Sequence, residues 1–329
     1  MAQLLKRLSG GEALSLDEAY LLAREILSGG LSDVAIAATL TAMRCRGETA
    51  EEVAGFVKFA REVAVKVPLR VEAIDTAGTG GDGAGTINLS TAAAVVAAAA
   101  GARVLKHGNR SASGLFGSAD FVEAVGYNLD VGPEKAAEMV ERVGFAFVFA
   151  PKYHPAFARV APVRRQLPFR TVFNIVGPLA NPGLVKRQLI GVSERRLLDV
   201  VGGVASMLLD TALVVYGPGV DEVSTEGPTE VVEVRRGRAE RYVVTPEDFG
   251  VQKTPIPRAS SREEAVALAL AGLRGEHREA MVAIAVNASA ALYVAGVARD
   301  FRDGYGLAVN AIREGAAYRK LVEAVEASR

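Results

Sequence analysis

The chain has 329 residues and half of them are apolar, so its length suits one large domain or two ordinary domains with a sizeable core. Its formal net charge is zero, which argues against a general nucleic-acid-binding protein, because such proteins usually carry a basic excess. The single cysteine, Cys45, excludes an internal disulfide, and its place after an apolar helical stretch favours a buried structural thiol.

The sequence predicts neither a targeting segment nor a membrane span. Residues 1–7 lack the apolar core of a signal peptide, and the longest apolar run, residues 92–100, is too short to cross a bilayer. We therefore expect a cytoplasmic protein without a membrane partner.

Residues 1–66 carry helical patterns only. Capping boxes begin at Ser15 and Thr49, and Ser32 is a further N-cap candidate; each precedes apolar residues at helical spacing. Pro68 ends this segment. The pattern predicts a small helical bundle whose remaining apolar surface either packs within the protein or forms a dimer interface.

From Val71 onward, short apolar strands alternate with helices, which is typical of an α/β domain with a mostly parallel sheet and helices on both faces. The predicted strands are 71–75, 103–106, 145–149, 187–192 and 211–216. The predicted helices between them are 90–100, 118–125, 133–143, 154–166 and 194–209. An antiparallel hairpin at 229–244 follows, and the last predicted helices are 261–273, 279–296 and 306–327. Ligands of such folds bind beyond the carboxyl ends of the strands, so one crevice should be lined by the loops 76–90, 107–117, 150–153 and 217–224.

The loop within residues 74–91 contains five glycines between Gly78 and Gly85. Glycine lets backbone N–H groups approach an anion, and a helix predicted to begin at Ser90 adds the positive end of its dipole. The Gly-x-Gly-x-x-Gly spacing is present, but the Lys-Ser/Thr of a Walker A loop is not, and Asp82 would repel a phosphate unless a cation lay between them. This loop predicts an anion site, with a tight turn that binds nothing as the alternative.

A second glycine- and serine-rich loop runs from Lys106 to Asp120. Lys106 can act as a point charge on phosphate and Arg110 can bind one bidentately, although either side chain alone is equally well interpreted as solvated. His107 is a candidate acid–base residue, although a lone histidine is more often structural. Two such loops at successive strand ends favour a polyphosphate ligand.

Asp221 and Glu222 follow the strand predicted at 211–216. Carboxylate oxygens at the end of a strand suit Mg²⁺, which prefers to be shared between carboxylates and substrate phosphates. The alternative is a solvated acidic loop.

The stretch from Lys152 to Pro182 is rich in prolines and basic residues. Gly177 and Pro178 are expected to break any helix and to fix a turn. Arg164 or Arg165 can pair with a substrate carboxylate bidentately, and a solvated cation on a surface helix is the competing interpretation.

Taken together, these motifs resemble those of the anthranilate phosphoribosyltransferase family, whose enzymes join anthranilate to phosphoribosyl pyrophosphate (PRPP) in tryptophan biosynthesis. The resemblance covers essentially the whole chain. The residues that carry it are Gly78–Gly83, Asn88–Thr91, Lys106–Arg110, Gly117–Asp120, Tyr153–Pro155, Arg164, Phe173–Asn174, Gly177–Pro182 and Asp221–Glu222. The chain departs from many family members at Leu115 and Phe116, where those have Lys and Ser.

The resemblance implies the site residues. The PRPP site would comprise Gly78, Gly81, Asp82, Thr86, Asn88, Leu89, Ser90, Thr91, Lys106, His107, Gly108, Asn109, Arg110, Ser111, Ala112, Ser113, Gly114 and Ser118. Anthranilate would contact Gly78, Asn109 and Arg164, with His107, Gly177 and Pro178 nearby. Mg²⁺, typically two ions, would be held by Ser90, Asp221 and Glu222. Catalysis would be electrostatic, with Lys106 and His107 as the candidate catalytic residues.

The resemblance also implies a homodimer formed through a small helical domain. That domain would comprise residues 1–68 and about 165–185, and residues 69–164 and 186–329 would form the large α/β domain that binds PRPP. Two alternatives remain open: an enzyme like pyrimidine nucleoside phosphorylase, and a non-catalytic relative that binds nucleic acid. Asp82 argues against the first, and the zero net charge argues against the second.

Overall fold

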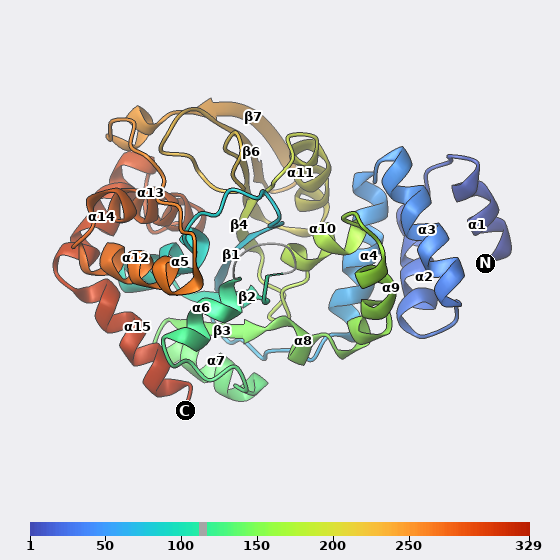
Figure 1. Ribbon diagram of the computed structural model, residues 1–329, viewed down its shortest axis with the longest axis horizontal. Helices are drawn as coiled ribbons and strands as arrows, with labels where there is room; N and C mark the ends of the chain where they lie inside the picture. Colours follow the sequence, from blue (N-terminus) through green and yellow to red (C-terminus); the bar gives the residue numbers. More distant parts are fainter. Residues whose placement is uncertain (112–116) are drawn as a thin grey trace.

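The computed structural model describes residues 1–111 and 117–329. Figure 1 shows a group of helices at one end of the molecule, which carries the N-terminus, beside a larger part in which helices cover a twisted sheet. The C-terminus lies on the far side of this larger part, at the end of the last helix.

The N-terminal region is helical, as predicted. Its helices are α1 (Ala2–Ser9), α2 (Leu16–Leu27), α3 (Asp33–Arg46) and α4 (Ala50–Val63). Both predicted capping boxes form: the hydroxyls of Ser15 and Thr49 accept hydrogen bonds from the backbone N–H three residues ahead, at 3.3 and 3.2 Å. Cys45, near the end of α3, is exposed, so the prediction of a buried thiol is wrong.

The sheet has seven strands in the order β3-β2-β1-β4-β5-β6-β7. The strands are β1 (Ile74–Gly78), β2 (Val104–Gly108), β3 (Phe145–Phe149), β4 (Arg187–Gly191), β5 (Thr211–Tyr216), β6 (Thr229–Arg235) and β7 (Arg238–Val244). The first five are parallel, and β6 and β7 form the predicted antiparallel hairpin. A mostly parallel sheet is therefore confirmed.

Helices cover both faces of the sheet. The remaining helical elements are α5 (Leu89–Ala99), α6 (Ser118–Ala124), α7 (Pro133–Arg142), α8 (Ala150–Tyr153), η1 (Pro155–Arg159), α9 (Ala161–Gln166), α10 (Val172–Leu179), α11 (Leu197–Leu208), η2 (Pro246–Phe249), α12 (Arg262–Arg274), α13 (Arg278–Ala295), α14 (Phe301–Arg313) and α15 (Ala316–Ala327). In Figure 1, α5 and α12–α15 lie on one side of the sheet, and α11 and the N-terminal helices lie on the other.

Two hydrophobic cores follow from this arrangement, because successive side chains of a strand point to opposite faces. Leu189 and Leu213 belong to the core with α5 and α13, whereas Ile190 and Val214 belong to the second core. That second core contains the buried side chains of α2–α4 together with those of α9, α10 and α11. Segments near residues 165–185 thus pack with the N-terminal helices, but the predicted limits of the two domains stay a prediction.

α13 is, within residues 1–111 and 117–329, the one helix long and apolar enough to cross a membrane. However, 72% of its apolar window is buried inside the protein, as expected for a core helix.

Three predictions about helices differ from the structure. The span predicted as one helix at 154–166 contains two short helices, η1 and α9, because Pro162 lacks the N–H that a helix continuing from η1 would need. The helix predicted at 306–327 is two helices, separated at Gly315, whose φ of 72° is left-handed. Gly177 and Pro178 were expected to break any helix, but they lie in the last turn of α10.

Candidate active site

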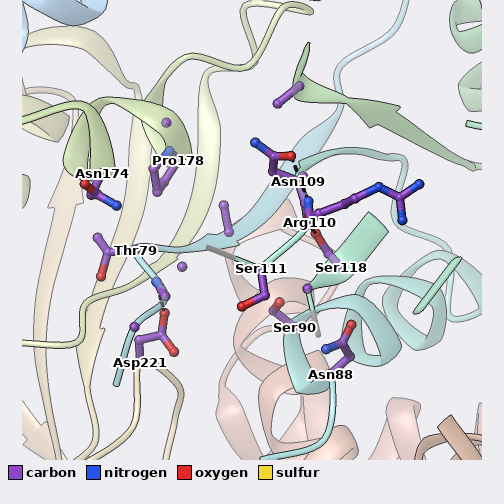
Figure 2. A pocket seen from close by; sticks show the side chains of 18 of the residues that line it. Thr79, Asn88, Ser90, Asn109, Arg110, Ser111, Ser118, Asn174, Pro178 and Asp221 are labelled. Carbon is purple, nitrogen blue, oxygen red and sulfur yellow. Dashed lines mark hydrogen bonds between the residues drawn. The ribbon is translucent and has the colours of Figure 1, made fainter. Parts of the chain in front are cut away.

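The carboxyl ends of the parallel strands open onto one cavity of about 710 Å³. All four loops that were predicted to share a crevice contribute to its lining. Figure 2 shows Thr79, Asn174 and Pro178 on one side of this cavity, with Asn109, Ser111 and Ser118 across from them. The segment between α9 and α10 supplies a further wall.

Every described residue that the sequence placed in the site lines this cavity. These residues are Gly78, Gly81, Asp82, Thr86, Asn88, Leu89, Ser90, Thr91, Lys106, His107, Gly108, Asn109, Arg110, Ser111, Ser118, Arg164, Gly177, Pro178, Asp221 and Glu222. Ala112, Ser113 and Gly114, and the departures at Leu115 and Phe116, lie outside the described residues. The lining alone does not assign a ligand to any of them.

The helix after the glycine loop begins one residue earlier than predicted. Asn88, not Ser90, is the N-cap of α5, and Ser90 is the second residue of the helix. The Ser90 hydroxyl is therefore not a cap: it accepts a hydrogen bond from Lys106 Nζ at 3.2 Å, and the Ser90 N–H donates to Glu222 Oε1 at 3.1 Å.

Three carboxylates gather below the glycine loop. Asp221 Oδ2 accepts a hydrogen bond from the Gly80 N–H at 2.6 Å, and the Asp221 N–H lies 3.4 Å from Asp82 Oδ2. Burial, together with the negative charge of Asp82, raises the pKa of Asp221 to about 6. Burial and the charge of Asp221 raise the pKa of Glu222 well above its usual range. Crowded, half-buried acids of this kind are stabilised in their charged form by a cation.

The donor set fits Mg²⁺. No group of three or more His, Cys, Asp or Glu side chains among residues 1–111 and 117–329 forms a closed cage for a metal ion. The hard oxygen donors present are the carboxylates of Asp221 and Glu222 and the hydroxyl of Ser90. They do not fill the coordination shell of a metal ion, so substrate phosphate oxygens and water can occupy the remaining positions. Mg²⁺ is usually bound in this way.

Lys106 is a buried cation beneath the glycine loop. Its ammonium donates to the Thr76 carbonyl oxygen, and only 2% of the residue is exposed. Burial lowers its pKa, whereas the carboxylates of Asp75 and Glu222 raise it. The alternative of a solvated lysine is therefore wrong.

Arg110 is engaged by acidic residues of α6. Its guanidinium lies 2.8 Å from Asp120 and 2.7 Å from Glu123, and Figure 2 shows it extended away from Ser90. The pKa of Arg110 is raised by Glu123 and Asp120. A bidentate contact with phosphate would require this side chain to leave at least one of these partners.

The opposite wall is aromatic and carries Arg164. The rings of His107 and His154 lie 5.0 Å apart, and His154 packs 5.2 Å from Phe157. Arg164 lies 5.6 Å from the ring of Phe173 and donates to Asn174 Oδ1 at 3.3 Å. Such a wall can accept a flat, carboxylated ring.

Both histidines of this wall are neutral at pH 7. Burial lowers the pKa of His107 well below its usual range, and it lowers the pKa of His154 to about 4. Because these imidazoles are neutral, the wall carries its positive charge on arginine.

The sequence left Arg164 and Arg165 as alternative partners for a substrate carboxylate, and it gave no sign that Arg170 belongs to the site. Arg165 is exposed, whereas Arg164 and Arg170 both line the cavity. Arg170 donates hydrogen bonds to the carbonyl oxygens of Thr79 and Gly80. No local pattern around Arg170 signals this contact, because its partners lie about ninety residues earlier in the chain.

Two family models match the chain. One, described as "Glycosyl transferase family, a/b domain", matches residues 70–318, and the other, described as "Glycosyl transferase family, helical bundle domain", matches residues 2–64. The anthranilate phosphoribosyltransferase of Pyrobaculum islandicum is 86% identical over 329 residues, which are 100% of both chains. The chain belongs to the anthranilate phosphoribosyltransferase family.

Solved structures of anthranilate phosphoribosyltransferases have the same fold. The enzyme of Thermus thermophilus is 40% identical, with a TM-score of 0.93 over 99% of each chain. The enzyme of Saccharomyces cerevisiae in complex with PRPP and Mg is 25% identical, with a TM-score of 0.84 over 95% of this chain and 92% of its own. The fold and family expected from the resemblance are thus confirmed, and the two alternatives are set aside.

Proposed function

We propose that the chain transfers the phosphoribosyl group of PRPP to the amine of anthranilate, and releases pyrophosphate, in the cavity at the carboxyl edge of the sheet. As a member of its family, the chain is a phosphoribosyltransferase that acts on anthranilate in tryptophan biosynthesis. The proposed location of the reaction rests on one observation: the glycine loop, Lys106 and the Asp221–Glu222 pair line the same cavity as Arg164. An anionic donor and a carboxylated aromatic acceptor can therefore meet there.

PRPP would lie between the loops that follow β1 and β2. Positive φ angles at Gly80, Gly81 and Gly83 let N–H groups of the first loop turn toward an anion. The first turn of α5 adds further N–H groups, and Lys106 adds a buried positive charge. The proposed PRPP-binding residues are Gly78, Gly81, Asp82, Thr86, Asn88–Thr91, Lys106–Gly114 and Ser118.

Mg²⁺ would be held by Ser90, Asp221 and Glu222. When bound, it neutralises charge on the pyrophosphate and improves the leaving group. The raised pKa of Asp221 supports this assignment, because a cation would offset the repulsion among these neighbouring acids. Asp82 adds a third carboxylate next to Asp221, which supports the proposal of two ions rather than one.

Anthranilate would bind between the donor loop and the aromatic wall. Arg164 would hold its carboxylate bidentately, and Gly78 and Asn109 would contact it from the donor side. His107, Gly177 and Pro178 would adjoin the ring. Contact between Arg164 and Asn174 supports this role because it orients the guanidinium.

The reaction needs little proton transfer from the protein. The amine of anthranilate is unprotonated near neutral pH, so its lone pair forms the bond to the ribose C1 while the bond from C1 to the pyrophosphate oxygen breaks. The transition state is oxocarbenium-like, and the positive charge of Lys106 would stabilise the departing pyrophosphate. The amine proton is then lost. Orientation of the two substrates can supply up to roughly 7–11 kcal/mol of the lowered barrier.

The quaternary structure and location are part of the proposal. We propose a homodimer formed through the helical domain, residues 1–68 and about 165–185, with residues 69–164 and 186–329 as the PRPP-binding domain. We propose that the enzyme works in the cytoplasm.

Loss of anthranilate fluorescence tests the function. The expected result is a loss that requires PRPP, Mg²⁺ and the protein together, and that stops when EDTA is added. PRPP binding by calorimetry without any loss of fluorescence would show that a different nucleophile is the acceptor. Absence of both would contradict the proposed function.

A further inference from the structure

Arg170 holds the glycine loop from the segment that precedes α10. It lies one residue before Thr171, the N-cap of α10, and is half-buried. Its guanidinium donates to two successive backbone carbonyl oxygens, those of Thr79 and Gly80. A planar guanidinium presents two parallel N–H groups, which suits two neighbouring acceptors in a way that an ammonium does not.

The other polar groups of the same two residues are held from different directions. The Thr79 N–H donates to the Gly191 carbonyl oxygen at 2.9 Å, and the Thr79 hydroxyl accepts from the Ser193 N–H at 3.0 Å. The Gly80 N–H donates to Asp221 at 2.6 Å. Arg170 therefore completes a set of contacts that determines how this part of the loop is oriented.

The orientation of these peptide groups decides where the next N–H groups point. In a planar trans peptide, a carbonyl and the N–H that follows it point in opposite directions. With the Thr79 carbonyl directed at Arg170, the Gly80 N–H points toward Asp221. With the Gly80 carbonyl directed at Arg170, the Gly81 N–H points away from the guanidinium.

This stretch of backbone needs an external constraint. Gly80 and Gly81 have φ angles of 62° and 73°, and glycine has more conformational freedom to lose than any other residue. Half-buried carboxylates also lie nearby, with Asp82 and Asp221 among the acidic groups around Arg170. A cation at this position offsets part of their repulsion while it holds the loop.

We propose that Arg170 is a positioning residue for PRPP: its guanidinium orients the Thr79–Gly80 and Gly80–Gly81 peptide groups so that the glycine loop is ready for the pyrophosphate. This inference rests on the proposed function. Because Arg170 adjoins α10, whose Asn174 contacts Arg164, the same side chain also connects the acceptor wall to the donor loop.

Kinetics of three variants test this role. Arg170→Lys keeps the positive charge but loses the two parallel N–H groups of the guanidinium, and Arg170→Gln loses both. Arg142→Gln is a control at an exposed arginine on α7. We expect the KM for PRPP to rise about tenfold or more in both Arg170 variants, while the KM for anthranilate changes less than about twofold. Calorimetry should show the same loss of PRPP affinity without anthranilate.

Other outcomes overturn the proposal. A rise in the anthranilate KM alone would mean that Arg170 contacts the acceptor directly. Unchanged values of both KM, with only a lower unfolding temperature, would reduce its role to stability. Calorimetry measures PRPP binding without turnover. If the wild-type protein bound PRPP but had no activity, the proposed function would be contradicted, but the PRPP affinities of the Arg170 variants would still test the role of Arg170. A fourth variant, Arg170→Ala, should regain part of its PRPP affinity when millimolar guanidinium is added, which a general loss of stability would not produce.

Discussion

Asp221 occupies the space that a side chain at Gly191 would need. A Cβ added to Gly191 would lie 1.6 Å from the Asp221 carbonyl oxygen, and one added to Gly78 would lie 2.3 Å from Asp221 Oδ2. Gly78 and Gly191 are register partners on β1 and β4, so two neighbouring positions of the sheet beneath Asp221 lack a side chain. The acidic loop can therefore lie directly on the sheet, where its carboxylate reaches the glycine loop.

Replacement of Gly191 by alanine should displace Asp221. The clash is with backbone atoms, which cannot move aside as the end of a side chain can, so we expect a loss of about 1–3 kcal/mol in unfolding free energy. We also expect activity at limiting Mg²⁺ to fall at least about tenfold, because the metal-binding carboxylate moves. Urea unfolding and Mg²⁺ titrations of the initial rate measure the two effects.

Gly306→Ala is the matched control for that variant. Gly306 lies on the exposed side of α14, and a Cβ there meets no atom within 4 Å. This variant should be neutral or more stable by about 0.5–1 kcal/mol. If Gly191→Ala behaved like Gly306→Ala, the close approach of Asp221 to the sheet would not matter.

Asp221→Asn should raise the Mg²⁺ concentration needed for half-maximal activity by about tenfold or more. The amide keeps the shape of the side chain but is a poor ligand for a hard cation. Since burial and Asp82 raise the pKa of Asp221 to about 6, protons should compete with Mg²⁺ in the wild type as the pH falls below that value. Glu240→Gln, at an exposed position on β7, should leave the titration unchanged.

Arg164→Lys should raise the KM for anthranilate about tenfold while the KM for PRPP stays nearly constant. Lysine keeps the positive charge but cannot form the bidentate contact with a carboxylate. Initial rates at varied anthranilate and saturating PRPP measure the effect. If Arg165→Lys at the exposed neighbouring position gave this result instead, Arg165 rather than Arg164 would bind the carboxylate of anthranilate.

His154 should make the stability of the protein depend on pH. Burial lowers its pKa from an ordinary value near 6.5 to about 4 in the folded protein, so between these values the unfolded chain binds a proton that the folded chain does not. The contribution of this residue to unfolding free energy is therefore complete above about pH 6.5 and is lost as the pH falls through 4, by about 3 kcal/mol in total.

His154→Phe removes this contribution and keeps a ring against Phe157. The loss of unfolding free energy between pH 7 and pH 4.5 should be about 2 kcal/mol smaller in the variant than in the wild type. Urea unfolding at both pH values gives this difference, and the acidic residues common to both proteins cancel from it. Parallel pH curves would show that His154 titrates normally.

Much of the fold could be predicted because its signals are local. The capping boxes at Ser15 and Thr49, the alternation of strands and helices, and the glycine-rich loops are each specified by residues a few positions apart. A parallel sheet then brings its carboxyl ends to one edge, which is why the loops converge on one cavity. The helix breaks near Pro162 and Gly315 were missed because apolar periodicity continues on either side of each break.

The sequence by itself determined the family, the order of the elements and most of the residues that line the cavity, since all of these are encoded in patterns along the chain. Only the tertiary structure decided how those residues are held: the burial of Lys106, the pairing of Arg110 with Glu123, and the contact of Arg170 with Gly80. The physical reason is that a side chain's partners and dielectric surroundings come from segments far away in the sequence. The hydrogen bond between Gly80 and Asp221, 141 residues apart, exists only once the sheet has assembled.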